Sequence, residues 1–192
     1  MAVPGPVDDV PPTFLRALAG LRATDVRPEV RLTEVPAPQR VAPYAFALAA
    51  EVVASGEELA SGRLIVLHDP HGQDGWDGTT RLVAYVRSAL EAEMAGDPLL
   101  AEVGWSWLLD ALAARGAGHA ATGGTVTRTS SARFGAMAEE GDEADVEIRA
   151  SWTPSTPDDL GAHLLAWCDL LSLSAGLPPP GVVAMPLPRS IS

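Results

Sequence analysis

Apolar residues recur at the spacing of an α-helix in three stretches of the chain. Residues 12–24 place large apolar side chains on one helical face behind two prolines, and proline is favoured at the first position of a helix. Residues 97–116 begin with an Asp-Pro pair, residues 156–176 begin with a Thr-Pro pair, and both stretches end at a glycine. These are typical helix boundaries, so we predict helices in all three stretches.

Other stretches alternate apolar and polar residues, which is the pattern of a strand with one buried face. The alternation is clearest at residues 144–152, where apolar residues occupy every second position. Residues 44–53 alternate large residues with alanine, so they predict a strand but also permit a helix. The pair Gly123 and Gly124 predicts a bulge. In all, we predict strands at residues 29–35, 44–53, 63–68, 122–131 and 144–152.

Residues 79–94 connect the third and fourth of these strands. Leu82, Val86 and Leu90 share one face at helical spacing, so we predict a further helix there. The element order is then α-β-β-β-α-α-β-β-α. It predicts an α+β fold, with a mostly antiparallel sheet of about five strands packed with about four helices. This order resembles that of the secretion chaperones, although a shared fold does not carry a function.

The length and composition indicate one folded unit. A chain of 192 residues suits a single domain, which we place at residues 12–177. The 17 prolines and 18 glycines are concentrated between the elements and at the two ends. We therefore predict a flexible N-terminus at residues 1–11 and a proline-rich C-terminal tail at residues 178–192.

Charge and composition argue against several classes of partner. The formal net charge is −12, and all 13 basic residues are arginine, so nucleic acid and anionic membranes would repel the chain. No apolar run approaches the ~18 residues of a membrane span, and the N-terminus lacks the features of an export signal. The single cysteine, Cys168, lies in an apolar helical pattern and indicates a buried thiol in a reducing compartment. We expect a cytoplasmic protein that binds neither nucleic acid nor membrane.

The end of the strand at residues 63–68 and the loop that follows it hold the densest group of side chains that could bind a ligand or a metal ion. His68 and His71 are three residues apart, with Asp69 and Asp74 beside them, so ligands for a divalent cation are available. In the alternative interpretation the aspartates form turns and the histidines lie at a hydrated surface. No metal-binding signature fits this spacing, so we predict no metal site and no cofactor.

Five tryptophans are many for a chain with three phenylalanines and two tyrosines. Trp107, Trp152 and Trp167 fall on apolar stripes, which predicts that they lie in the core. Trp76 and Trp105 fall off these stripes, so each can face a ligand, a partner or the next element of the fold. The candidate ligand-binding residues are therefore His68, Asp69, His71, Asp74, Trp76 and Trp105.

Nucleophilic catalysis has little support in the sequence. No Gly-x-Ser-x-Gly turn occurs. His163 and Cys168 are five residues apart on one predicted helix, which turns their side chains away from each other. We therefore predict no catalytic residue.

Several long phrases of the sequence resemble a known family. They include RPEVRLTEVPAPQRVAPYAFALAAEV at residues 27–52, LHDPHGQDGWDGTTRLVAYVR at 67–87 and LGAHLLAWCDLLSLSAGLPP at 160–179. These phrases are similar to an actinobacterial family known as domain of unknown function 3000, and the similarity covers about residues 13–187. The resemblance implies a cytosolic actinobacterial protein, and it implies no activity, substrate or catalytic residue.

Two hypotheses for the function remain open. The first is a non-enzymatic, chaperone-like module that binds an unknown protein partner through a sheet face or a helix groove, and that forms a homodimer in one version. The second is an enzyme or sensor that handles a small molecule or a metal at the loop from His68 to Asp77. The acidic charge and the missing catalytic constellation favour the first.

Overall fold

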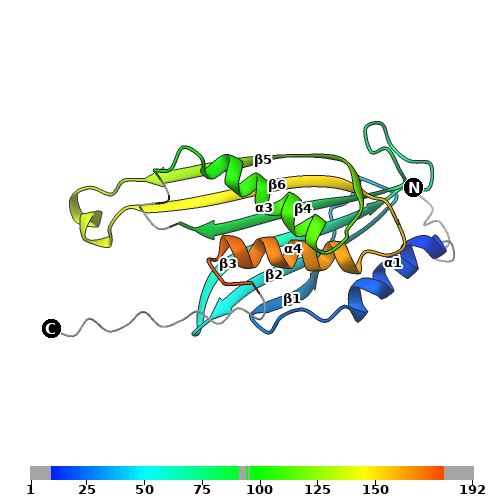
Figure 1. Ribbon diagram of the computed structural model, residues 1–192, viewed down its shortest axis with the longest axis horizontal. Helices are drawn as coiled ribbons and strands as arrows, with labels where there is room; N and C mark the ends of the chain where they lie inside the picture. The colour runs from blue at the N-terminus through cyan, green and yellow to red at the C-terminus, as the bar shows by residue number, and fades with distance from the viewer. Residues whose placement is uncertain (1–9, 91–93, 95, 180–192) are drawn as a thin grey trace, which may run out of the picture.

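A computed structural model of the chain describes residues 10–90, 94 and 96–179, and these residues form one antiparallel sheet with helices on one side (Figure 1). Predictions for residues 1–9 and 180–192 lie outside the described residues. The sheet has six strands in the order β1-β2-β3-β4-β6-β5. The elements are α1 (Pro12–Ala23), β1 (Val30–Val35), β2 (Tyr44–Ala54), β3 (Glu57–His68), β4 (Thr80–Ala89), α3 (Leu100–Ala114), β5 (His119–Ser131), the 3-10 helix η1 (Gly135–Glu140), β6 (Glu143–Pro154) and α4 (Gly161–Ser174).

The predicted α+β class and antiparallel sheet are confirmed, but the helix predicted at residues 79–94 is wrong. Most of that stretch is the strand β4, which pairs with β3 and with β6. The sheet therefore has six strands instead of about five. Buried positions in β4 recur every second residue, at Leu82, Ala84 and Val86. The intervening Val83 and Tyr85 also have large apolar side chains. Because both faces of the strand are apolar, the alternation of period two is obscured and the sequence also fits a helical pattern.

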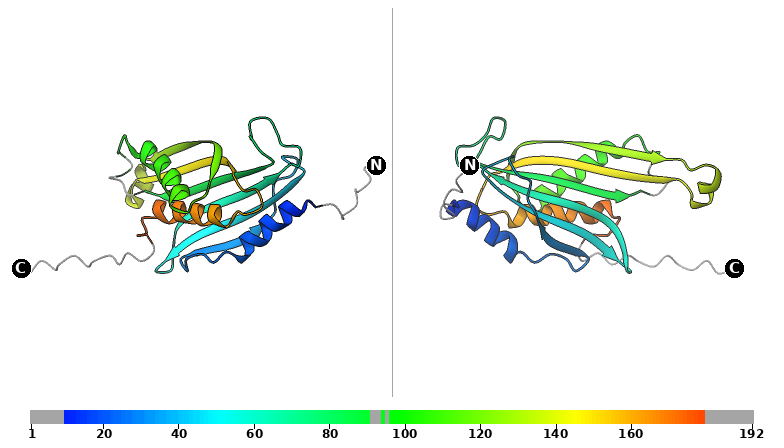
Figure 2. Two further views of the ribbon diagram at one scale, coloured as in Figure 1. Left: turned by 45° about the vertical axis from the view of Figure 1, so that its right-hand side comes forward. Right: turned by 180° about the vertical axis from the view of Figure 1, so that it is seen from behind.

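The helices all lie on one face of the sheet among the described residues, and the opposite face carries none (Figure 2). Side chains at every second strand position point toward α1, α3 and α4 and form the core. Trp152 and Trp167 are fully buried, as predicted, while Trp107 is only partly buried against the core. The larger strand residues of this core are Leu64, Val66, Leu82, Val86, Val146, Ile148 and Trp152.

Two strand glycines allow the helices to approach the sheet closely. A Cβ at Gly62 in β3 would lie 2.5 Å from the carbonyl oxygen of Tyr85 and 3.1 Å from the Trp167 ring of α4. A Cβ at Gly124 in β5 would lie 2.8 Å from the Trp105 ring of α3. The register of β5 shifts between Ala120 and Gly123, just before the pair at which the bulge was predicted, while Gly123 and Gly124 themselves pair regularly with β6. Indole rings thus fill the space that side chains would occupy at two strand positions.

Within the described part of the chain, no helix is long and apolar enough to cross a bilayer.

The glycine packing gives a testable pair of variants. Gly62→Ala places a methyl group against a backbone carbonyl and two core side chains, so we expect a loss of about 1–3 kcal/mol in the free energy of unfolding. Gly20→Ala is the control, because no atom lies within 4 Å of that Cβ and the residue is inside α1. It should gain about 0.5–1 kcal/mol. Urea unfolding measures both values, and equal effects would contradict the packing argument.

Candidate functional site

His68 belongs to the core rather than to a hydrated loop. It ends β3 with only 2% of its surface exposed, and its ring stacks on Phe14 at a centroid distance of 5.7 Å. Its Nδ1 forms a hydrogen bond of 2.9 Å with the Thr80 hydroxyl. Burial lowers the pKa of His68 from its usual value, and the nearby Asp69 opposes this only in part. The imidazole therefore joins α1 to the end of the sheet.

The other candidate residues of the loop organise turns at the surface. The Asp69 carboxylate accepts hydrogen bonds from the His71 backbone N–H at 3.0 Å and from the Gln73 side chain at 3.3 Å. His71 and Asp74 are exposed and line an open, polar hollow of about 410 Å³. The structure does not bring His68 and His71 together, since one imidazole is buried and the other faces solvent. Across the described residues, no three His, Cys, Asp or Glu side chains converge on a common point.

The two candidate tryptophans lie on different elements. Trp76 is partly buried, and its backbone carbonyl accepts a hydrogen bond from the Thr153 hydroxyl of β6. This bond ties the loop to the edge of the helix-free face. Trp105 is on α3, where its ring lies over Gly124 and packs against the core. The second indole therefore packs as part of the fold.

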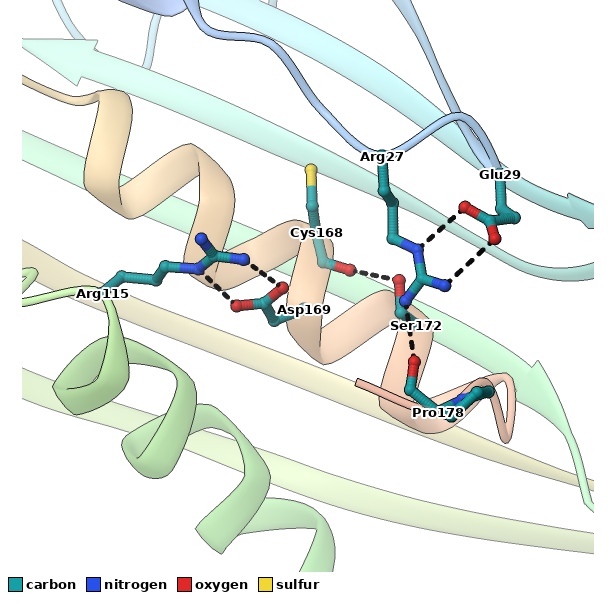
Figure 3. A network of polar contacts seen from close by, with 7 residues as sticks. All are labelled: Arg27, Glu29, Arg115, Cys168, Asp169, Ser172 and Pro178. Carbon is teal, nitrogen blue, oxygen red and sulfur yellow. Dashed lines mark hydrogen bonds and ion pairs between the residues drawn. The ribbon is translucent and has the colours of Figure 1, made fainter. Parts of the chain in front are cut away.

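A groove between α3 and α4 is lined mainly by apolar groups, and Figure 3 shows the polar contacts of Arg115 and Arg27, two of its lining residues. Its volume is about 340 Å³, and Ala111, Ala114 and Leu173 contribute to its walls. Arg115 of α3 binds both carboxylate oxygens of Asp169 of α4, at 2.6 and 2.8 Å. This bidentate geometry is the stronger form of an arginine–carboxylate pair.

A second arginine closes the other end of the groove. Arg27 binds the Glu29 carboxylate at 3.0 and 3.2 Å and donates to the Pro178 carbonyl at 3.1 Å. The segment that follows α4 is thereby anchored to the start of β1. Because both guanidinium groups are already paired, the groove offers an apolar shape with few free hydrogen-bond donors.

Cys168 lies beneath this network, and its thiol is inert. The residue is 2% exposed, and burial raises the pKa of its thiol to about 12. A thiol with that pKa stays protonated near neutral pH, so it is neither a nucleophile nor a metal ligand. The prediction of a buried, structural cysteine is confirmed.

The helix-free face of the sheet, here called the open face, was not singled out by the sequence. Strand register places Val35, Ala47, Ile65 and Val83 next to one another, so an apolar row crosses four strands. Ala47 is 1% exposed although it lies outside the main core cluster. Beside this row is a hollow of about 370 Å³ whose lining includes Arg63, Ile65 and Tyr85. The sequence feature that indicates this face is the presence of apolar residues at both the inward and the outward positions of β4.

Arginines surround the apolar row. Arg31 and Arg63 are exposed and make no hydrogen bond or ion pair with any other described residue. Arg81 donates only to the neutral hydroxyls of Ser151 and Thr153, at 2.8 and 3.1 Å. Arg149 is different, because it pairs with Glu147 at 3.2 Å and lies over the Tyr85 ring. Arg31 lies farther along β1, directly across the strands from Glu51. The apolar row is therefore flanked by two arginines without a carboxylate partner, Arg63 and Arg81, in a chain of net charge −12.

Stability measurements can separate the two loop histidines. His68→Ala removes a buried ring and its hydrogen bond, so we expect a loss of about 2–4 kcal/mol in the free energy of unfolding. His71→Ala is the matched control, because only its backbone N–H is bonded, and its effect should stay within about 0.5 kcal/mol. Equal effects in thermal or chemical unfolding would show that this assignment of the two imidazoles is wrong.

A buried histidine in the core predicts acid sensitivity. His163 accepts a hydrogen bond of 3.0 Å from the Trp152 indole through Nδ1, and burial, aided by His119, lowers its pKa from 6.5 to about 4. A depressed pKa means that the unfolded chain takes up this proton first as the pH falls. Stability should therefore fall between about pH 6.5 and 4, by up to about 3 kcal/mol. His163→Gln keeps an acceptor without the titration, so its unfolding free energy should be flatter over this window.

Comparison with known proteins places the chain in a family. Residues 10–183 match the model of the family described as protein of unknown function (DUF3000), close to the range 13–187 expected from the sequence. No curated protein and no solved structure matches the chain. The family description carries no activity, so the site geometry is the source of functional inference. Because the match spans most of its length, the chain belongs to the DUF3000 family.

Proposed function

We propose that this chain is a cytoplasmic, non-enzymatic protein-binding module, and that the open face is its binding surface. One observation carries the proposal: an apolar row crosses four strands on a helix-free face and is bordered by arginines that have no carboxylate partner. Protein interfaces combine an apolar centre with a polar rim, and arginine is enriched in them. The partner is an apolar polypeptide segment that carries acidic residues.

The residues on the open face depart from those of an ordinary solvated sheet surface. An antiparallel sheet with one hydrated face normally alternates apolar and polar residues. Here Ile65 and Val83 occupy outward positions and are paired directly across the strands. The small side chain of Ala49 lowers the surface beside Ile65, which contributes to the hollow next to Tyr85. A partner side chain can enter this hollow without any rearrangement of the sheet.

The arginines beside the apolar row favour one class of polypeptide partner, a segment that carries acidic residues. A surface row of Ile and Val would attract apolar segments of many kinds, but Arg63 and Arg81 lie two residues from Ile65 and Val83 and have no carboxylate partner among the described residues. An acidic segment supplies that charge, while a basic segment is repelled. The remainder of the chain is strongly acidic, so a basic partner would be drawn to other surfaces.

Cross-linking of the open face tests this function. A photoreactive residue at position 83 should form covalent adducts with a polypeptide in native cells, because Val83 ends the apolar row and lines the hollow beside it. The same residue at position 15 of α1 is the control, since Leu15 is 53% exposed on the opposite side. Adding Ile65→Glu should reduce the adducts at position 83 about tenfold.

Two results would contradict the proposal. The first is an adduct pattern that is the same at positions 83 and 15. The second is an adduct yield at position 83 that Ile65→Glu leaves unchanged while circular dichroism shows a native fold. Mass spectrometry of the adduct then identifies the partner segment, and its acidic residues can be counted directly.

A further inference from the structure

The connection between β5 and β6 forms an exposed tip with unusual side chains. Residues 131–143 lie at one end of the molecule, past the end of β4 (Figure 1). Phe134 is 82% exposed and Met137 is 51% exposed. A large aromatic residue exposed to this degree beside a methionine marks a contact surface, because both residue types are enriched at protein interfaces.

Ion pairs hold the backbone that presents these side chains. Arg133 contacts the carboxylates of Glu140 at 3.3 Å and Glu143 at 2.6 Å. Its backbone N–H also donates to the Asp142 carboxylate at 3.2 Å. The loop is therefore closed on itself, and Phe134 is exposed on an ordered turn. With Glu139 included, the tip carries four carboxylates against one guanidinium.

The tip and the open face are complementary in both apolar content and charge. We propose that the tip of one copy docks on the open face of a second copy, with Phe134 and Met137 against the apolar row. The tip carboxylates then face Arg63 and Arg81, which form no ion pair within the described part of one chain. This inference rests on the proposed function of the open face, and it names a second copy of the chain as the occupant.

The contact has to form between two copies because the two surfaces are far apart in one chain. Glu143 at the tip and Ser151 beside Val83 lie on the same strand, β6. The eight residues that separate them span about 27 Å of extended chain. A strand paired on both sides cannot fold back over that distance without losing its ladder.

A two-fold axis allows both contacts to form at once. If it runs parallel to the sheet, above Glu147 on the open face and perpendicular to β6, it brings each tip over Ser151 of the other copy, beside Val83 of the apolar row. Near such an axis the same surface patch of each copy faces the other, so favourable charge contacts require both acidic and basic side chains in that patch. The open face has them there, since Asp145 pairs with Arg87 at 2.7 Å and Glu147 pairs with Arg149 at 3.2 Å.

Sedimentation velocity of the full chain tests the proposal. We expect a wild-type dimer that weakens as salt is raised, since screening acts on the carboxylate–arginine contacts. Phe134→Ser with Met137→Ser should raise the dimer dissociation constant at least about tenfold, and Val83→Arg should do the same from the other side of the contact. Leu15→Ser, an exposed apolar residue on α1, is the control and should remain dimeric.

Mixing the variants gives a sharper result than either one alone. The tip variant keeps an intact open face and the Val83→Arg variant keeps an intact tip, so an equal mixture should recover dimers with one native contact. Each variant mixed with itself should stay monomeric. Circular dichroism checks that both remain folded, and exposed positions should permit this.

The outcomes also separate this inference from the proposed function. A monomeric wild type, or a dimer that survives loss of Phe134 and Met137, overturns the exchange of tips. The open face could then still bind a foreign segment, which the adducts at position 83 would identify. If the tip substitutions weaken the dimer but Val83→Arg leaves its dissociation constant unchanged, the open face is not the docking surface. In that case the cross-linking at position 83 decides the proposed function independently.

Discussion

The packing of two indole rings over strand glycines determines which face of this sheet is covered. The ring of Trp167 lies over Gly62, and that of Trp105 lies over Gly124, so α4 and α3 lie close against β3 and β5. The Trp167 indole also donates to the Tyr85 carbonyl at 3.4 Å, which links α4 to β4. These contacts are possible only where a strand has no side chain. Both helices are thereby directed to one face, and the other face remains uncovered by any described helix.

This one-sided arrangement separates the chemistry of the chain into two environments. The groups most able to react lie on the covered side, where burial lowers the pKa of His163 and raises that of Cys168. Both groups are thus held neutral and take part in packing. Arg63 and Arg81, which have no carboxylate partner among the described residues, lie on the open side, where solvent or a partner can reach them. A division of this kind suits a surface that binds better than a site that catalyses.

The sequence predicted most elements because their apolar period was clear, and it failed where two faces were apolar at once. In β6 every second residue is polar, so the strand was predicted. In β4 the outward Val83 and Tyr85 blurred that period, so a helix was predicted instead. The same outward residues form the open face, which explains why the sequence missed both together. His68 was misjudged for another reason, because its burial depends on Phe14, a residue far away in the chain.

Charge decides how an acidic chain can bind selectively through such a face. With a net charge of −12, the chain as a whole is expected to repel polyanions such as nucleic acid. Arg63 and Arg81 act only at short range, because solvent ions screen the more distant acidic charges and leave a positive field beside the row. Under the proposed function, an acidic segment would be retained only if its apolar residues also reach the row of Ile65 and Val83. Selectivity then arises because neither the apolar contact nor the charge contact is sufficient alone.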